Sequence, residues 1–110
     1  MDNEELFADL IDAFAGSPGV TLPRESGRSG FGSHALKVNG SIFAMLVRGH
    51  LVVKLPRERV GALVGSGVGV PFDANKGKPM KEWLTVTSAD NERWLSLSRE
   101  ALEFVGSKRR

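Results

Sequence analysis

The chain has 110 residues, of which 41% are hydrophobic and 25% are charged. This composition is typical of one globular domain and excludes disordered and low-complexity classes. It contains no cysteine, which excludes disulfides, thiolate metal sites and cysteine nucleophiles. Residues 1–5 are acidic, unlike the start of a signal peptide, and no apolar run approaches the length of a membrane span. We expect a single domain over residues 1–110, frayed at 1–2 and 107–110, in a cytoplasmic protein without membrane contact.

Charge is distributed unevenly along the chain. Residues 1–23 hold five acidic residues and no basic residue. Residues 24–81 hold ten basic and three acidic residues, a net charge of +7. Such segregation can create a positive face that attracts anionic partners. It can equally pair an acidic first helix with a basic middle segment inside the fold, which is the interpretation we favour because charge asymmetry between neighbouring elements is common.

The first 33 residues predict a helix followed by an irregular connection. Apolar residues recur at helical spacing over residues 3–15, which predicts an amphipathic helix packed on a sheet. These residues are Leu6, Phe7, Leu10, Ile11 and Phe14. Residues 20–33 are rich in glycine, serine and arginine. This stretch lacks the Gly-Lys-Ser/Thr ending of a phosphate-binding P-loop, so we expect a plain connection.

Residues 34–55 predict a meander of three antiparallel strands. Asn39-Gly40 is the strongest short hairpin signal, because both central residues of a type I′ turn need positive φ. Residues 48–50, Arg-Gly-His, predict a second tight turn. If both turns contain two residues, the alternation of side chains along the strands determines the sheet face on which each side chain lies.

Both faces of this predicted meander are apolar. One face carries Ile42, Ala44, Leu46, Leu51, Val53 and Leu55. The other carries His34, Leu36, Val38, Phe43, Met45, Val47, Val52 and Lys54. Either helices cover both faces, or one face meets a partner. The Met45 face suits an adaptable protein interface, but we favour its coverage by the last helix of the chain.

The second half of the chain predicts two helices and one further strand. A short helix begins at Pro56 and ends near Gly65, and residues 71–81 predict a loop. Residues 83–87 predict a fourth strand. Asp90 or Ser88 can cap a last helix that stops at Gly106. Its inward residues are Trp94, Leu97, Ala101, Phe104 and Val105. The predicted fold class is α+β: an antiparallel β-sheet, a three-strand meander plus a fourth strand, flanked by N- and C-terminal helices.

The order of these motifs resembles a known family. The motifs are the run from Ala35 to Ala44, the run from Leu51 to Pro56, Pro71-Phe72, Lys76-Gly77-Lys78-Pro79-Met80 and Trp83. Together they resemble the N-terminal domain of TfoX/Sxy-type competence regulators, and the related MmcQ/YjbR-like proteins, over roughly residues 30–105. The resemblance implies an antiparallel sheet flanked by helices and no established catalytic residues.

The chain departs from that family in two ways. The regulators continue into a second, helical domain, whereas this chain ends at Arg110. Family members tend to carry a methionine before the Phe-Gly pair, and here the stretch is Gly30-Phe31-Gly32. The competence role is therefore not carried over to this chain.

The sequence contains no recognisable catalytic or metal-binding motif. His34 and His50 lie sixteen residues apart, and neither belongs to an i, i+4 metal pair. No Ser, His and Asp occur together in a nucleophile motif. We therefore predict a protein that is not an enzyme and uses no cofactor or metal.

Basic residues of the middle segment are the best candidates for contact with a partner or an anion. They are Lys54, Arg57, Lys76, Lys78 and Lys81. The last three could bring three ammonium groups to one anion. Alternatively they stay solvated while Pro79 and Met80 plug the end of the sheet. The rings that could stack on bases, Phe31, Phe43 and Phe72, are better assigned to the core.

These residues lead to two functional hypotheses. We predict a non-enzymatic regulatory or adaptor domain, monomeric or homodimeric, that binds an unidentified partner protein. The alternative is a nucleic-acid-associated protein that uses the basic segment 24–81. Under the first hypothesis, we expect only weak nucleic-acid binding, at low salt.

Overall fold

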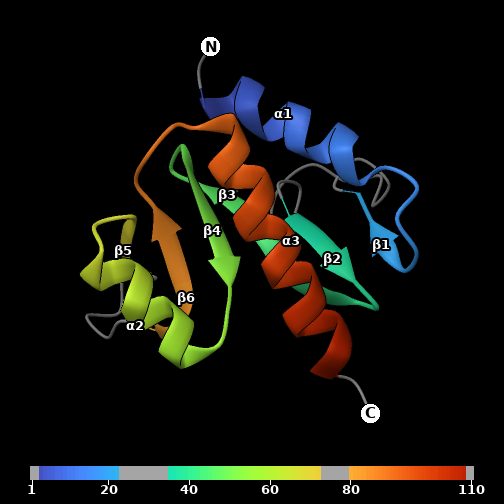
Figure 1. Ribbon diagram of the computed structural model, residues 1–110. Coiled ribbons are helices and arrows are strands. Elements are labelled where there is room, and N and C mark those ends of the chain that lie inside the picture. The colour runs from blue at the N-terminus through green and yellow to red at the C-terminus, as the bar shows by residue number, and fades with distance from the viewer. Residues whose placement is uncertain (1–2, 23–34, 73–79, 109–110) are drawn as a thin grey trace.

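The computed structural model describes residues 3–22, 35–72 and 80–108, which form three helices and six strands (Figure 1). The helices are α1 (Asn3–Phe14), α2 (Arg57–Gly65) and α3 (Asn91–Lys108). The strands are β1 (Val20–Thr21), β2 (Ala35–Val38), β3 (Ser41–Val47), β4 (His50–Lys54), β5 (Gly69–Phe72) and β6 (Met80–Val86). They build one antiparallel sheet in the order β1-β2-β3-β4-β6-β5. The predicted α+β class, an antiparallel sheet flanked by N- and C-terminal helices, is confirmed.

Both predicted turns of the meander are present. Asn39 and Gly40 have φ values of 53° and 87°, and Arg48 and Gly49 have φ values of 52° and 80°. Positive φ at both central residues is the geometry of a two-residue turn that matches the twist of its strands. His50, predicted within the second turn, is instead the first residue of β4 and pairs with Val47.

Because of a β-bulge in β3, the side chains of β2 lie on the opposite sheet faces from those predicted. Lys37 pairs with Ile42, but the next pair joins Leu36 to Ala44, so Phe43 is an extra residue in β3. Leu36 therefore shares a face with Ala44, where unbroken alternation had placed it with Met45. Phe43 also turns toward the core, and its ring meets the ring of Phe14 edge to face at 5.5 Å.

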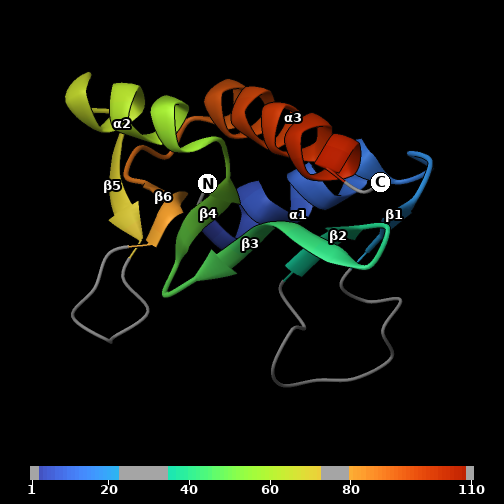
Figure 2. The ribbon, with the colours of Figure 1, turned by 90° about the horizontal axis from the view of Figure 1, so that it is seen from below.

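All three helices lie on one face of the sheet. Figure 2 shows α2 and α3 on the same side, and the buried residues of α1 belong to the same core cluster. Members of this cluster from the sheet include Leu36, Val38, Phe43, Ala44, Leu51, Val53, Leu84 and Val86. Members from α3 are Trp94, Leu97, Ala101 and Val105. The prediction that the last helix covers the Met45 face is wrong, because the bulge and the β4–β6 register gather the larger continuous apolar surface on the Ala44 face.

Two strands, β1 and β5, include residues for which the sequence predicted no strand. Val20 and Thr21 pair with Val38 and Lys37. The strand β5 begins before the predicted loop 71–81 and includes its first two residues, Pro71 and Phe72. It lies at the edge of the sheet, where proline is tolerated because one side of the strand needs no N–H donor. The strand predicted over residues 83–87 begins earlier, at Met80, and ends at Val86.

The last helix begins as predicted but ends later. The carboxylate of Asp90 accepts hydrogen bonds from the backbone N–H of Glu92 (3.0 Å) and of Arg93 (3.4 Å), so Asp90 is the N-cap. Gly106 does not stop the helix, which continues to Lys108. Glycine lowers helix stability but does not end a helix that packs against a sheet.

An ion pair joins α2 to α3. Arg59 donates from Nε and Nη2 to the two carboxylate oxygens of Glu100, at 2.9 Å each. These hydrogen bonds favour the charged guanidinium and raise the pKa of Arg59 above its ordinary value, against the lowering effect of burial. Both side chains are exposed, so we expect the pair to contribute less than about 1 kcal/mol.

Candidate functional site

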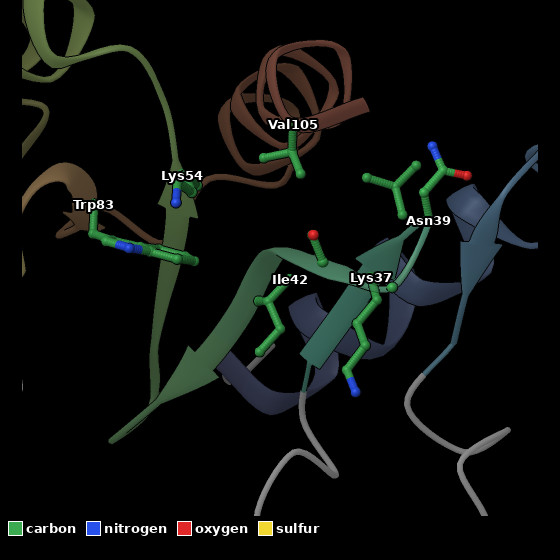
Figure 3. Close-up of a pocket in the computed structure, with 9 residues that line it drawn as sticks. Lys37, Asn39, Ile42, Lys54, Trp83 and Val105 are labelled. Carbon is green, nitrogen blue, oxygen red and sulfur yellow. The ribbon is translucent and has the colours of Figure 1, made fainter. Parts of the chain in front are cut away.

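A groove opens at the end of the sheet where β3 and β4 part (Figure 3). The two strands pair only from Ala44 to Val47, so the first residues of β3, Ser41–Phe43, have no partner in β4. The groove has a volume of about 510 Å³. This volume lies in the range of clefts that hold a ligand or a short segment of a partner.

The walls of the groove come from five elements. Its lining residues are Lys37, Val38, Asn39, Gly40, Ser41, Ile42, Lys54, Trp83 and Val105. In Figure 3, Lys54 and Trp83 stand on one side, Lys37 and Ile42 on the other, and Val105 of α3 reaches down from above. The site therefore combines two cations, one indole ring and aliphatic side chains.

The ammonium group of Lys54 is held in place by its neighbours. Its Nζ lies 5.3 Å from the centroid of the Trp83 ring and 4.0 Å from Oε1 of Glu82. The cation–π contact restricts the long side chain without neutralising its charge. The ion pair is partly exposed, with side-chain exposures of 28% and 39%, so it is weak. Because an ammonium carries three donors, Lys54 can still bind an anion.

Lys37 supplies the second cation of the groove. It pairs with Ile42 across the hairpin and is half-buried. Its ammonium group has no ion-pair partner among the residues that the structure describes. Its three N–H donors can therefore bind an anionic group.

A second hollow, of about 480 Å³, is linked to the groove by the ion pair between Lys54 of the groove and Glu82 of the hollow. It is lined by Pro56, Arg57, Glu58, Lys81, Glu82 and Phe104. The backbone N–H of Leu55 donates to the carbonyl of Glu82 at 2.9 Å, which holds the end of β4 beside β6 between the two hollows. Two acidic and two basic side chains line this second hollow, so it lacks the cationic excess of the groove.

Three of the five predicted contact residues meet at this end of the fold. Lys54 lines the groove, and Arg57 and Lys81 line the second hollow. Lys76 and Lys78 lie outside the described residues, so the predicted three-lysine cluster stays a prediction.

Two residues of the groove, Lys37 and Trp83, were missing from the predicted site. A lysine two positions before the Asn39-Gly40 turn, in an otherwise apolar strand, was a signal that could have pointed to Lys37. Trp83 has no comparable signal, because only the register of β6 reveals that it stands opposite Lys54.

The expected pairing of the acidic first helix with the basic middle segment stays a prediction, because Arg24, Arg28, Lys76 and Lys78 lie outside the described residues. Glu4, Asp9 and Asp12 are exposed on α1 and make no ion pair with described residues. The sequence asymmetry therefore persists on the surface of the molecule at these three positions.

The described residues offer no metal centre and no membrane span. Over residues 3–22, 35–72 and 80–108, no three histidine, aspartate or glutamate side chains gather as metal ligands. No helix in the same ranges is both long and apolar enough to cross a membrane. His50 is exposed, with Nδ1 3.2 Å from the carbonyl oxygen of Arg48, and His34 lies outside the described residues.

Comparison with known proteins gives no match to a family model, a curated protein or a solved structure. The resemblance to the TfoX N-terminal domain therefore stays a prediction. The functional argument rests on the groove and its side chains.

Proposed function

We propose that the protein is a non-enzymatic regulatory or adaptor module that binds an acidic partner protein at the groove. The observation that carries this proposal is that Lys37 and Lys54, from different strands, line opposite sides of one groove with partly apolar walls. Aromatic rings are enriched at protein interfaces, where they give contact area, and complementary charges give an interface its specificity.

The helix-free face of the sheet supports a macromolecular partner. Strand pairing joins Met45 to Val52, Val52 to Thr85 and Thr85 to Val70, so these side chains form one row across four strands. Among the described residues, Val70 is the large hydrophobic side chain that is exposed, at 47%. By strand parity, Lys54 lies on the same face as this row. Val52 in this row is fully buried, so a partner seated at the groove would reach this face at its exposed residues, such as Val70.

Trp83 favours a second candidate function, association with nucleic acid. An aromatic ring among cations is a platform for stacked bases. However, the Lys54 ammonium already lies over the ring, where it competes with a stacked base. We therefore place the protein partner first.

A capture experiment with the full chain from an extract of its native cells tests the proposal. It compares the wild type, the Lys37→Glu/Lys54→Glu variant and a control, Arg93→Glu/Arg99→Glu, which changes the same number of charges at exposed positions of α3. We expect a protein that resists nuclease, persists at about 0.15 M salt and is lost only with the groove variant. Capture that nuclease abolishes would favour the nucleic-acid function, and equal capture by both variants would refute the groove.

A further inference from the structure

The groove lies beside a stretch of strand that has no pairing partner on one side among the described residues. Ser41–Phe43 faces β2 on one side, and on the other side β4 pairs with β3 only from Ala44 onward. The end of β4 turns instead toward β6 through the hydrogen bond from Leu55 to Glu82. An open strand edge is a template on which an extended chain can add a further strand.

The two sides of the groove have different chemistry. Strand pairing and parity place Lys37, Ile42, Lys54 and Trp83 on the helix-free face of the sheet. Val105 belongs to α3 and approaches from the helix-covered face, where Val38 also joins the core. One side of the groove is therefore cationic with an indole ring, and the other is aliphatic.

We infer that the groove binds an extended segment of the partner in which carboxylate and apolar side chains alternate. Successive side chains of a strand point to opposite faces. A segment laid along Ser41–Phe43 would present every second residue to Lys37 and Lys54, and the residues between them to Val38 and Val105. This inference rests on the proposed function and names the chemistry of the partner segment.

The contacts of Lys54 favour a carboxylate over other anions. Its ammonium already lies 4.0 Å from the carboxylate of Glu82, so the groove accommodates this group beside Trp83. A stacked base would compete with Lys54 for the Trp83 ring. A second copy of the chain is a poorer occupant, because its acidic segment is the helix α1, whose apolar residues are buried in its own core.

Binding of defined peptides to the full chain tests this inference by fluorescence anisotropy. The probe is a labelled eight-residue peptide of alternating aspartate and leucine, and one comparison peptide carries asparagine for aspartate. Two further peptides carry N-methyl groups on either alternate set of residues, which removes those N–H donors. We expect affinity to fall at least about tenfold for the asparagine peptide and for one N-methylated peptide.

Protein variants assign the binding to the groove. Lys37→Gln/Lys54→Gln should weaken binding of the aspartate peptide at least about tenfold, and the control Arg93→Gln/Arg99→Gln should leave it unchanged. Circular dichroism checks that each variant is folded. If the double variant fails this check, the single variants Lys37→Gln and Lys54→Gln replace it, each with a smaller expected loss.

Four results would overturn the inference. They are equal affinity for the asparagine peptide, equal affinity for both N-methylated peptides, tighter binding of a single-stranded oligothymidine, and self-association in sedimentation that the groove variant abolishes. If the peptides fail while the groove variant still loses its captured protein, the proposed function stands and the extended acidic segment is wrong. If the peptides do not bind and the groove variant captures the same proteins as the wild type, the groove is not a binding site.

Discussion

The two faces of the sheet carry similar side chains but have different neighbours. On one face Ala44, Leu51 and Val53 are fully buried beneath three helices. On the other face Val52 is also fully buried, but Met45 is half-buried and Val70 is exposed, and no helix of the described residues lies on this side. The difference teaches that apolar character alone does not identify the core face of a strand. We propose that the helix-free face, with Lys37 and Lys54 at one end, is the side that meets a partner.

The largest expected effect comes from the helix-covered face. Phe14 is buried and meets Phe43 edge to face, so Phe14→Ala should lower the free energy of unfolding by about 3 kcal/mol. Met45→Ala, on the helix-free face, should cost about 1 kcal/mol or less. Urea denaturation measures both variants. Equal costs would remove the distinction between the faces.

Gly69 tests how closely the helix-covered side of the β5–β6 pair is packed. A Cβ atom at this position would overlap the backbone carbonyl oxygen of Thr85 and approach Leu84 Cδ1 at 3.1 Å. Gly69→Ala should therefore cost about 2 kcal/mol. The matched control Gly61→Ala has open space in α2 and should stabilise the protein by up to about 1 kcal/mol. Thermal denaturation would contradict this account if both variants melted at the same temperature.

The hairpin that carries the groove depends on one glycine. Gly40 has φ of 87° and open space around its Cα, so the penalty of a side chain there is conformational. Gly40→Val should cost about 1 kcal/mol or more, because a β-branched residue resists positive φ. An unchanged melting temperature would show that the turn tolerates valine and would weaken the assignment of a type I′ turn.

The smallest effect on stability is expected at the groove itself. Lys37→Gln/Lys54→Gln removes a weak, partly exposed ion pair and one cation–π contact, so the free energy of unfolding should change by less than about 1 kcal/mol. Guanidinium denaturation of the variant and the wild type measures this change. A loss of about 2 kcal/mol or more would assign the lysines a structural role and undermine the contrast between the two faces.

Periodicity and turn chemistry predicted most of the local structure. The spacing of Leu6, Leu10 and Phe14 predicts α1, and Asn39-Gly40 predicts the hairpin, because both signals act between residues close in the chain. The short edge strands β1 and β5 were missed, since two to four residues carry too little pattern and their conformation depends on a neighbouring strand. Of the candidate site, Lys54 was predicted, whereas Lys37 and Trp83 were recognised only from strand pairing.

The sequence by itself determined the fold class, the first and last helices and the two tight turns, because helix periodicity and positive φ are local properties. The tertiary structure decided the bulge at Phe43, the face on which the helices pack and the groove between Lys37 and Lys54. Each of these depends on register, and register is selected by the packing free energy of the whole sheet against the helices. One extra residue in β3 moved Leu36 to the opposite face, and no pattern confined to β2 encodes that shift.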